Sequence, residues 1–177
     1  MKFRPIRLSC CAVALLLVAT AAGAAAQERA ATHPKLVVTT LDGKTFDLAA
    51  HRGQWVIVNF WATWCSPCIA EMPAISKYVA THKRVAAIGL AWEDTTQDGL
   101  VKFAKKHPVD YPLAQMDTSR PPAGFVAPTA LPTTYLIAPD GAVAKHFLGP
   151  VDAKLLDAAI AAAGAPRPAA STSSGEH

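Results

Sequence analysis

Cys65 and Cys68 are separated by only two residues, in the segment Trp64-Cys65-Ser66-Pro67-Cys68. A pair at this spacing can open to a dithiol and close to a disulfide, which is the chemistry of thiol–disulfide exchange. We expect the pair at the start of a helix, where free N–H groups and the helix dipole stabilise a thiolate at Cys65. The spacing therefore predicts a redox site in which Cys65, exposed at the start of the helix, forms the mixed disulfide with a partner and Cys68, more buried, resolves it.

The segments on either side of the pair must hold it in place. The continuous apolar run 55–61 predicts a strand that is covered on both faces. After Cys68, apolar residues recur at helical spacing to about residue 82, which predicts a helix. Pro73 interrupts that pattern, so we expect a kink there. The dithiol is thus expected at a strand-to-helix turn.

The other expected elements define the fold class. Two short strands, 36–41 and 44–48, flank an Asp42-Gly43 turn, and they form an N-terminal β-hairpin. After the central strand and helix we expect a strand at 85–92, a helix at 97–106, a strand at 112–116, a loop at 120–130, hairpin strands at 133–138 and 143–148, and a helix at 152–163. This order predicts an α/β fold with a mixed central sheet and helices on both faces.

The first 26 residues have the character of an export signal. A basic start is followed by an apolar run that holds Cys10 and Cys11, and then by Ala24-Ala25-Ala26. We therefore expect cleavage before Gln27 and a periplasmic protein. The alternative is an uncleaved membrane anchor, since the apolar run approaches the roughly 20 residues that span a bilayer.

The expected organisation after the signal is a leader at 27–34, one domain at 35–164 and a disordered tail at 165–177, which is rich in Pro, Ala, Ser and Thr. The whole chain has a formal net charge of +4, and three of these charges belong to basic residues of the signal. No basic field is left to indicate nucleic-acid binding. Only two of the four cysteines remain, too few for a disulfide scaffold.

The block Asn59-Phe60-Trp61-Ala62-Thr63-Trp64-Cys65-Ser66-Pro67-Cys68 resembles the active-site block of the TlpA/ResA-like periplasmic thiol-disulfide oxidoreductases of the thioredoxin superfamily. Glu71-Met72-Pro73 and Leu131-Pro132-Thr133-Thr134, the latter followed by Asp140-Gly141, match further parts of the same pattern. The likeness runs from about residue 36 to 163. It implies a thioredoxin-like fold with the helix and strand of 97–116 as an insert.

The resemblance also implies roles for supporting residues. The Leu131–Pro132 bond should be cis and face the dithiol, so that the backbone of Leu131 can pair with an extended partner segment. Asn59 stands where thioredoxin itself carries a buried aspartate, and an amide cannot exchange a proton. Glu71 is the candidate for that task, and the alternative is an ordinary solvated glutamate on the surface of the helix. We expect burial to raise its pKa.

The resemblance further implies a reductant of protein disulfides that needs no cofactor besides the Cys65–Cys68 pair. Its partners would be apocytochrome c or a cytochrome oxidase copper-site protein, and a membrane thiol transporter would supply its electrons. The sequence does not decide which of these substrates is used. Trp64 is expected to pack around the sulfurs and shield them.

The cysteine pair has three other interpretations. A static disulfide would close so small a loop that it stabilises little. A zinc site lacks two further ligands with suitable spacing, because the six histidines are scattered singly. The alternative from another class is a thioredoxin-fold copper-delivery protein with His146 as third ligand, although such proteins usually place three residues between their cysteines.

Overall fold

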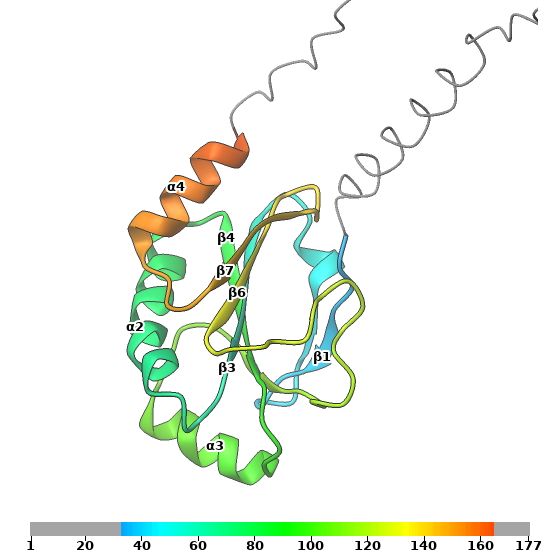
Figure 1. Ribbon diagram of the computed structural model, residues 1–177, viewed down its shortest axis with the longest axis vertical. Coiled ribbons are helices and arrows are strands. Elements are labelled where there is room, and N and C mark those ends of the chain that lie inside the picture. Colours follow the sequence, from blue (N-terminus) through cyan, green and yellow to red (C-terminus); the bar gives the residue numbers. More distant parts are fainter. Residues whose placement is uncertain (1–32, 165–177) are drawn as a thin grey trace, which may run out of the picture. The chain divides into compact units, whose positions relative to one another are not determined.

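The structure is a computed structural model, and it describes residues 33–164 (Figure 1). Its elements are β1 (Val37–Thr39), β2 (Thr45–Asp47), the 3-10 helix η1 (Leu48–His51), β3 (Trp55–Trp61), α2 (Ser66–Thr81), β4 (Val85–Ala91), α3 (Gln97–Lys106), β5 (Leu113–Gln115), β6 (Thr133–Ile137), β7 (Val143–Leu148) and α4 (Ala153–Gly164). The expected signal at 1–26 and tail at 165–177 lie outside the described residues.

The central sheet has five strands in the order β5-β4-β3-β6-β7. β3 lies in the middle, parallel to β4 and antiparallel to β6. Its apolar run is almost fully buried, because side chains pack on it from both sides. The expected mixed sheet is confirmed, and its register places Asn59 between Gly89 on one side and Thr134 on the other.

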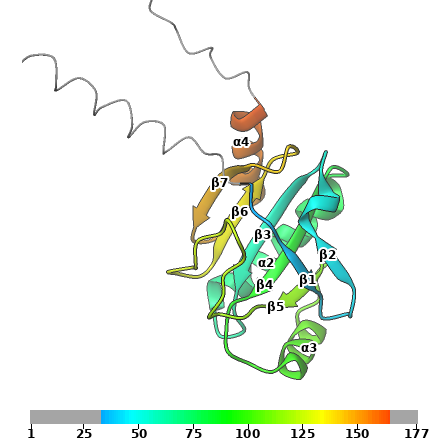
Figure 2. The same ribbon diagram turned by 90° about the vertical axis from the view of Figure 1, so that its right-hand side faces the viewer.

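All three α-helices pack on one face of this sheet, as Figure 1 shows with α2, α3 and α4 on the same side. The opposite face is covered by the β1–β2 hairpin, by η1 and by the segment 117–131. Figure 2 shows the hairpin lying in front of the sheet. Of the helical cover that we expected on both faces, only η1 lies on the second face.

The segment 117–131 explains the lack of an α-helix on that face. It contains three prolines, at 121, 122 and 128, which remove backbone donors and fix the chain in non-helical geometry. It covers the sheet instead with Phe125, whose ring packs edge-on against Phe60 and Tyr135.

The N-terminal hairpin is confirmed as a separate two-stranded sheet. Its strands are shorter than expected, because only Val37–Thr39 and Thr45–Asp47 pair with each other. Gly43 has a φ of +81° in the Asp-Gly turn, a conformation that glycine adopts without strain. A bridge between Thr40 and Ala114 joins the hairpin to the edge strand β5.

The helices begin and end close to where the sequence predicts. Thr96 caps α3 by accepting a hydrogen bond from the N–H of Gly99 at 3.2 Å. α2 continues through Pro73, so the expected kink stays a prediction. Among residues 33–164, no helix combines the length and the apolar character needed to cross a membrane.

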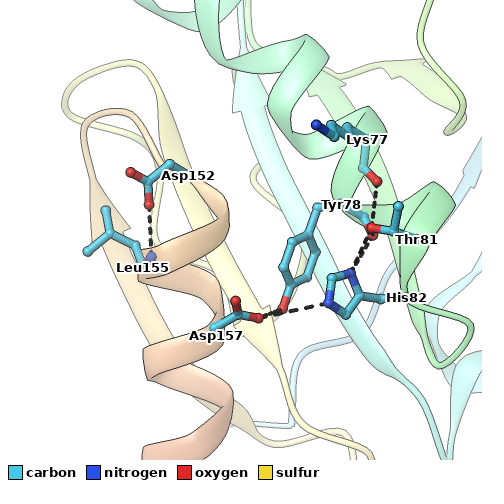
Figure 3. A network of polar contacts seen from close by, with 7 residues as sticks. All are labelled: Lys77, Tyr78, Thr81, His82, Asp152, Leu155 and Asp157. Atoms are coloured by element: carbon cyan, nitrogen blue, oxygen red, sulfur yellow. Dashed lines mark hydrogen bonds and ion pairs between the residues drawn. The ribbon is translucent and has the colours of Figure 1, made fainter.

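A polar contact joins the last turn of α2 to the first half of α4 (Figure 3). The hydroxyl of Tyr78 donates a hydrogen bond to Asp157 at 2.6 Å. The ring of His82 stacks on that of Tyr78 with 3.9 Å between centroids, and its Nε2 lies 3.9 Å from the Asp157 carboxylate. These contacts fix the helix that carries the dithiol against α4.

Candidate active site

Cys65 and Cys68 form a disulfide at the N-terminus of α2, four residues after β3 ends. Cys65 is the N-cap of the helix, and its sulfur accepts a hydrogen bond from the N–H of Cys68 at 3.3 Å. Pro67 lies in the first turn, where the missing N–H has no helical partner to lose. The strand, the turn and the helix therefore hold the pair where the sequence predicts it.

The two sulfurs differ in burial less than expected. Cys65 is 4% exposed and Cys68 is 0% exposed, so Cys68 is the more buried but Cys65 is nearly covered as well. Trp64 is 69% exposed, so most of this residue lies in solvent, and its expected role in shielding the sulfurs stays a prediction. A bulky apolar surface therefore stands beside the disulfide.

Glu71 lies one turn after Cys68 on α2, and its carboxyl is held by two hydrogen bonds. The side-chain amide of Asn59 donates to Oε1 at 2.8 Å, and the backbone N–H of Val151 donates to Oε2 at 2.7 Å. Glu71 is only 4% exposed. The sequence left open whether this residue is a solvated surface glutamate, and the structure places it in the core.

This burial changes the acidity of the carboxyl. Removal from water raises the pKa of Glu71 to about 7, although the hydrogen bonds from Val151 and Asn59 act in the opposite direction. The expected rise is therefore confirmed. A group with this pKa exchanges a proton readily near neutral pH, three residues from Cys68.

Asn59 connects the sheet to this carboxyl. It is fully buried on β3, and its amide donates both to Glu71 and to the hydroxyl of Thr134 on β6 at 2.9 Å. Asn59, the residue that departs from the thioredoxin pattern, and Glu71 thus belong to one hydrogen-bonded group. Asn59 cannot titrate as the aspartate of thioredoxin does, but its amide donates a hydrogen bond that positions the titrating carboxyl of Glu71.

The Leu131–Pro132 peptide bond is cis, as the resemblance implies. The register of β3 and β6 pairs Phe60 with Thr133, so Pro132 is placed level with Trp61 at the end of β3 that leads to the dithiol. Leu131 packs against the core cluster that contains both cysteines. The structure therefore brings this segment to the expected end of the sheet, and its role in holding a partner stays a prediction.

Sequence reasoning missed Glu93, which supports the loop before Cys65. Its carboxylate accepts hydrogen bonds from the N–H of Thr63 at 2.7 Å and from the Thr63 hydroxyl at 3.0 Å. A signal was available: Glu93 follows β4, and the carboxyl ends of the parallel strands β3 and β4 meet at one edge of the sheet.

His146, the third ligand of the copper alternative, lies far from the dithiol in this topology. It pairs with Tyr135, and the two rings stack with 4.2 Å between centroids. Tyr135 belongs to the core on the sheet face opposite α2, so the sheet separates His146 from the cysteines. Within residues 33–164, no three His, Cys, Asp or Glu side chains gather as a metal site would require.

Known proteins share this arrangement. The AhpC/TSA family model matches residues 30–146. The thiol-disulfide oxidoreductase ResA of Bacillus cereus is 34% identical over 117 residues, which cover 66% of this chain and 67% of ResA. The structure of Mycobacterium tuberculosis dsbF, in mixed oxidised and reduced forms, matches with a TM-score of 0.61 and 26% identity over 75% of this chain and 97% of dsbF.

Bacillus subtilis StoA matches with a TM-score of 0.58 over 73% of this chain and 98% of StoA. At 20% identity this match shows the fold alone. The ResA match shows more, because it is 34% identical and covers 67% of ResA. The chain therefore belongs to the AhpC/TSA family and is a ResA-like thiol-disulfide oxidoreductase with a thioredoxin-like fold.

Proposed function

We propose that this protein is an exported reductant of protein disulfides, in which Cys65 attacks the partner and Cys68 resolves the complex. The observation that carries the proposal is the position of the Cys65–Cys68 disulfide at the N-terminus of α2, one turn before the buried carboxyl of Glu71. The pair itself holds the two electrons that are transferred, and we propose that no further cofactor takes part.

The reaction has two exchange steps. In the reduced protein, the Cys65 thiolate attacks one sulfur of the partner disulfide, forms a mixed disulfide and releases the other partner sulfur as a thiolate. Cys68 then gives up its proton and attacks the Cys65 sulfur, which breaks the mixed disulfide. The partner leaves with two reduced cysteines, and the protein is left with the Cys65–Cys68 disulfide, oxidised by two electrons.

Glu71 supplies the proton chemistry of the second step. Cys68 is fully buried, so its proton has no direct path to bulk water. The Glu71 carboxylate accepts that proton, and its pKa of about 7 allows it to pass the proton to the departing partner thiolate. Asn59 and the N–H of Val151 hold the carboxyl in place during the transfer.

The partner surface is proposed at the same end of the sheet. An extended segment of the partner would pair with the backbone of Leu131 and rest against the exposed Trp64. Partners of the kind that the resemblance implies are the haem-site cysteines of apocytochrome c or the thiols of a cytochrome oxidase copper site. Cleavage before Gln27 would leave the protein in the periplasm. Its electrons would therefore have to cross the membrane, and a membrane thiol transporter would supply them.

Trapping tests the order of attack. The variant Cys68→Ser cannot resolve a mixed disulfide, so it should accumulate covalent complexes with a peptide that carries a disulfide. The matched variant Cys65→Ser keeps the buried cysteine and should form none. Complexes with Cys65→Ser alone would reverse the assignment of the two roles.

The redox potential tests the direction of transfer. Equilibration of the pair with glutathione should give a value closer to the roughly −270 mV of thioredoxin than to the roughly −120 mV of DsbA. A value near that of DsbA would identify an oxidant and overturn the proposed reductase. Mass spectrometry of the exported protein checks the location separately: an intact N-terminus in the membrane fraction would favour the anchor over cleavage before Gln27.

A further inference from the structure

One polar atom beside Glu71 has no hydrogen-bond partner among residues 33–164. It is Oδ1 of Asn59, on a side chain that is fully buried in the middle strand β3. The other two buried side-chain atoms in this condition are Nε1 of Trp61 and the hydroxyl oxygen of Tyr111. Of the three side chains, only that of Asn59 is hydrogen-bonded to Glu71 in the described part of the chain. An unpaired buried acceptor is costly, so Oδ1 calls for an explanation.

The nitrogen of the same amide is fully used. Nδ2 donates to Oε1 of Glu71 at 2.8 Å and to the hydroxyl oxygen of Thr134 at 2.9 Å. An amide nitrogen carries two hydrogens, and each of them has a partner here. This arrangement suits the charged form of Glu71, because a carboxylate accepts hydrogen bonds and cannot donate one.

The neutral form of Glu71 makes a different demand. Oε2 accepts a hydrogen bond from the N–H of Val151 at 2.7 Å, so the added proton is best placed on Oε1. The resulting O–H group faces Nδ2 of Asn59, which is a donor as well. Glu71 is only 4% exposed, so this O–H group needs an acceptor inside the protein.

A half-turn of the Asn59 amide about its last side-chain bond supplies that acceptor. The turn exchanges the positions of Nδ2 and Oδ1, and the shape of the amide stays nearly the same. Oδ1 then accepts from the O–H group of Glu71 and, with its second lone pair, from the hydroxyl of Thr134. Thr134 fits both orientations, because a threonine hydroxyl can accept in one and donate in the other.

Only a side chain with both a donor and an acceptor can serve the two forms of Glu71 in this way. A charged aspartate at position 59 could accept but not donate, and it would place a second negative charge beside the carboxyl. An apolar side chain could do neither. The amide of Asn59 offers each form of Glu71 the partner that it needs.

The titratable groups around Glu71 do not impose one orientation on this amide. On α2, Cys68 titrates only when the disulfide is open. In the connection between α3 and β5, burial and after it the charge of Glu71 raise the pKa of Tyr111, so this hydroxyl stays neutral. In the same connection, the carboxylate of Asp110 accepts a hydrogen bond from Ser76 at 2.9 Å.

We propose that Asn59 is a positioning residue whose side-chain amide reverses with the proton of Glu71: Nδ2 donates to the charged carboxylate, and Oδ1 accepts from the neutral carboxyl. This inference rests on the proposed function, in which Glu71 takes the proton of Cys68 and passes it on. The amide would turn once when the proton arrives and turn back when it leaves. Both forms of Glu71 would then keep a hydrogen-bonded partner on β3.

The orientation of the amide can be observed directly. Asn59 is the only asparagine of the chain, so labelling with ¹⁵N-asparagine gives a single side-chain amide. Nuclear Overhauser effects from its two hydrogens report whether the nitrogen faces Thr134. The oxidised full chain is the sample of choice, because its cysteines do not titrate.

The contact between the amide hydrogens and the side chain of Thr134 should be present at about pH 8.5 and lost at about pH 5, on either side of the Glu71 pKa of about 7. The loss should follow one titration with a midpoint near that pKa. A contact that persists unchanged at both pH values would show a fixed amide and overturn the inference.

Two variants serve as controls. Glu71→Gln keeps every histidine of the chain but has no carboxyl at position 71, so the contact should not change with pH. Glu93→Gln removes a different carboxylate, one that bonds Thr63, and should keep the wild-type change. A change that survives in Glu71→Gln would assign the reversal to another group and contradict the proposal.

A second measurement separates this inference from the proposed function. The pH profile of thiol alkylation in reduced Glu71→Gln tests whether Glu71 takes part in the proton transfer. If that profile differs from the wild type and the amide stays fixed, the proposed function holds and only the reversal is refuted. If the profile equals that of the wild type, the proposed role of Glu71 fails, and the role of Asn59 in exchange fails with it.

Discussion

Replacement of Glu71 by glutamine should remove a fall in stability that the wild-type protein shows between pH 4.5 and about 7. Burial raises the pKa of Glu71 from its ordinary value of 4.5 to about 7 in the folded chain. At about 1.36 kcal/mol per pKa unit, this difference corresponds to roughly 3 kcal/mol as an upper value for the free energy of unfolding.

The direction follows from the state of the proton. Below pH 4.5 the carboxyl is neutral in both the folded and the unfolded chain, so the stabilising contribution is fully present. As the pH rises toward 7, the unfolded chain loses the proton while the folded chain keeps it, and stability falls. Above about pH 7 the folded chain must hold a buried charge, and the contribution is lost. Glutamine has no such transition.

The measurement is urea unfolding of the oxidised protein at several pH values from 4.5 to 8.5. Glu71→Gln should be less stable than the wild type at low pH, because its NH₂ group cannot accept the Val151 hydrogen bond. Only the slope with pH carries the test. The difference between the two proteins also removes the contributions of the histidines, which both chains share.

Glu93→Gln is the matched control. It also removes a carboxylate that bonds the active-site loop, but it leaves the Asn59–Glu71 pair intact. It should therefore keep the fall in stability that Glu71 causes. Parallel stability curves for the wild type and Glu71→Gln would refute the reasoning, because they would show that the folded protein bears the charge of Glu71 at no cost.

Two further predictions concern packing around the site. Tyr78→Phe should lower the free energy of unfolding by about 1 kcal/mol, since it removes the hydrogen bond to Asp157 but leaves that exposed carboxylate free to bind water; an unchanged urea midpoint would show that the contact between α2 and α4 adds nothing. Gly89→Ala should cost about 1–2 kcal/mol, because a Cβ there would lie 2.5 Å from Cδ2 of Leu113. Gly164→Ala, where nothing lies within 4 Å, is its control in thermal unfolding, and equal losses in both variants would contradict the crowding at Gly89.

Features that depend on local chemistry could be predicted from the sequence alone. The apolar run of β3, the cysteine spacing and Pro67 in the first turn together place the dithiol at a strand-to-helix boundary, because each acts on its immediate neighbours. The Asp42-Gly43 turn likewise defined the N-terminal hairpin. The order of these elements was enough to predict a mixed sheet, since crossover units and hairpins pair strands in different directions.

The tertiary structure decided which side of the sheet each element covers. The periodicity of apolar residues shows that a helix has an apolar face. It does not show which of the two faces of the sheet that helix covers. All three α-helices lie on the face of the dithiol, while a proline-rich segment covers the other. The same limit applies to His146, whose place on the face away from the cysteines follows from the register of β6 and β7.

The tertiary structure also decided the chemistry of Glu71. From its position on the helix, Glu71 could not be assigned to the surface or to the core. Its burial and its two donors come from Asn59, 12 residues earlier, and from Val151, 80 residues later. Local sequence determines turns and caps because their partners are neighbours along the chain, whereas the pKa of a buried carboxyl depends on groups that only folding brings together.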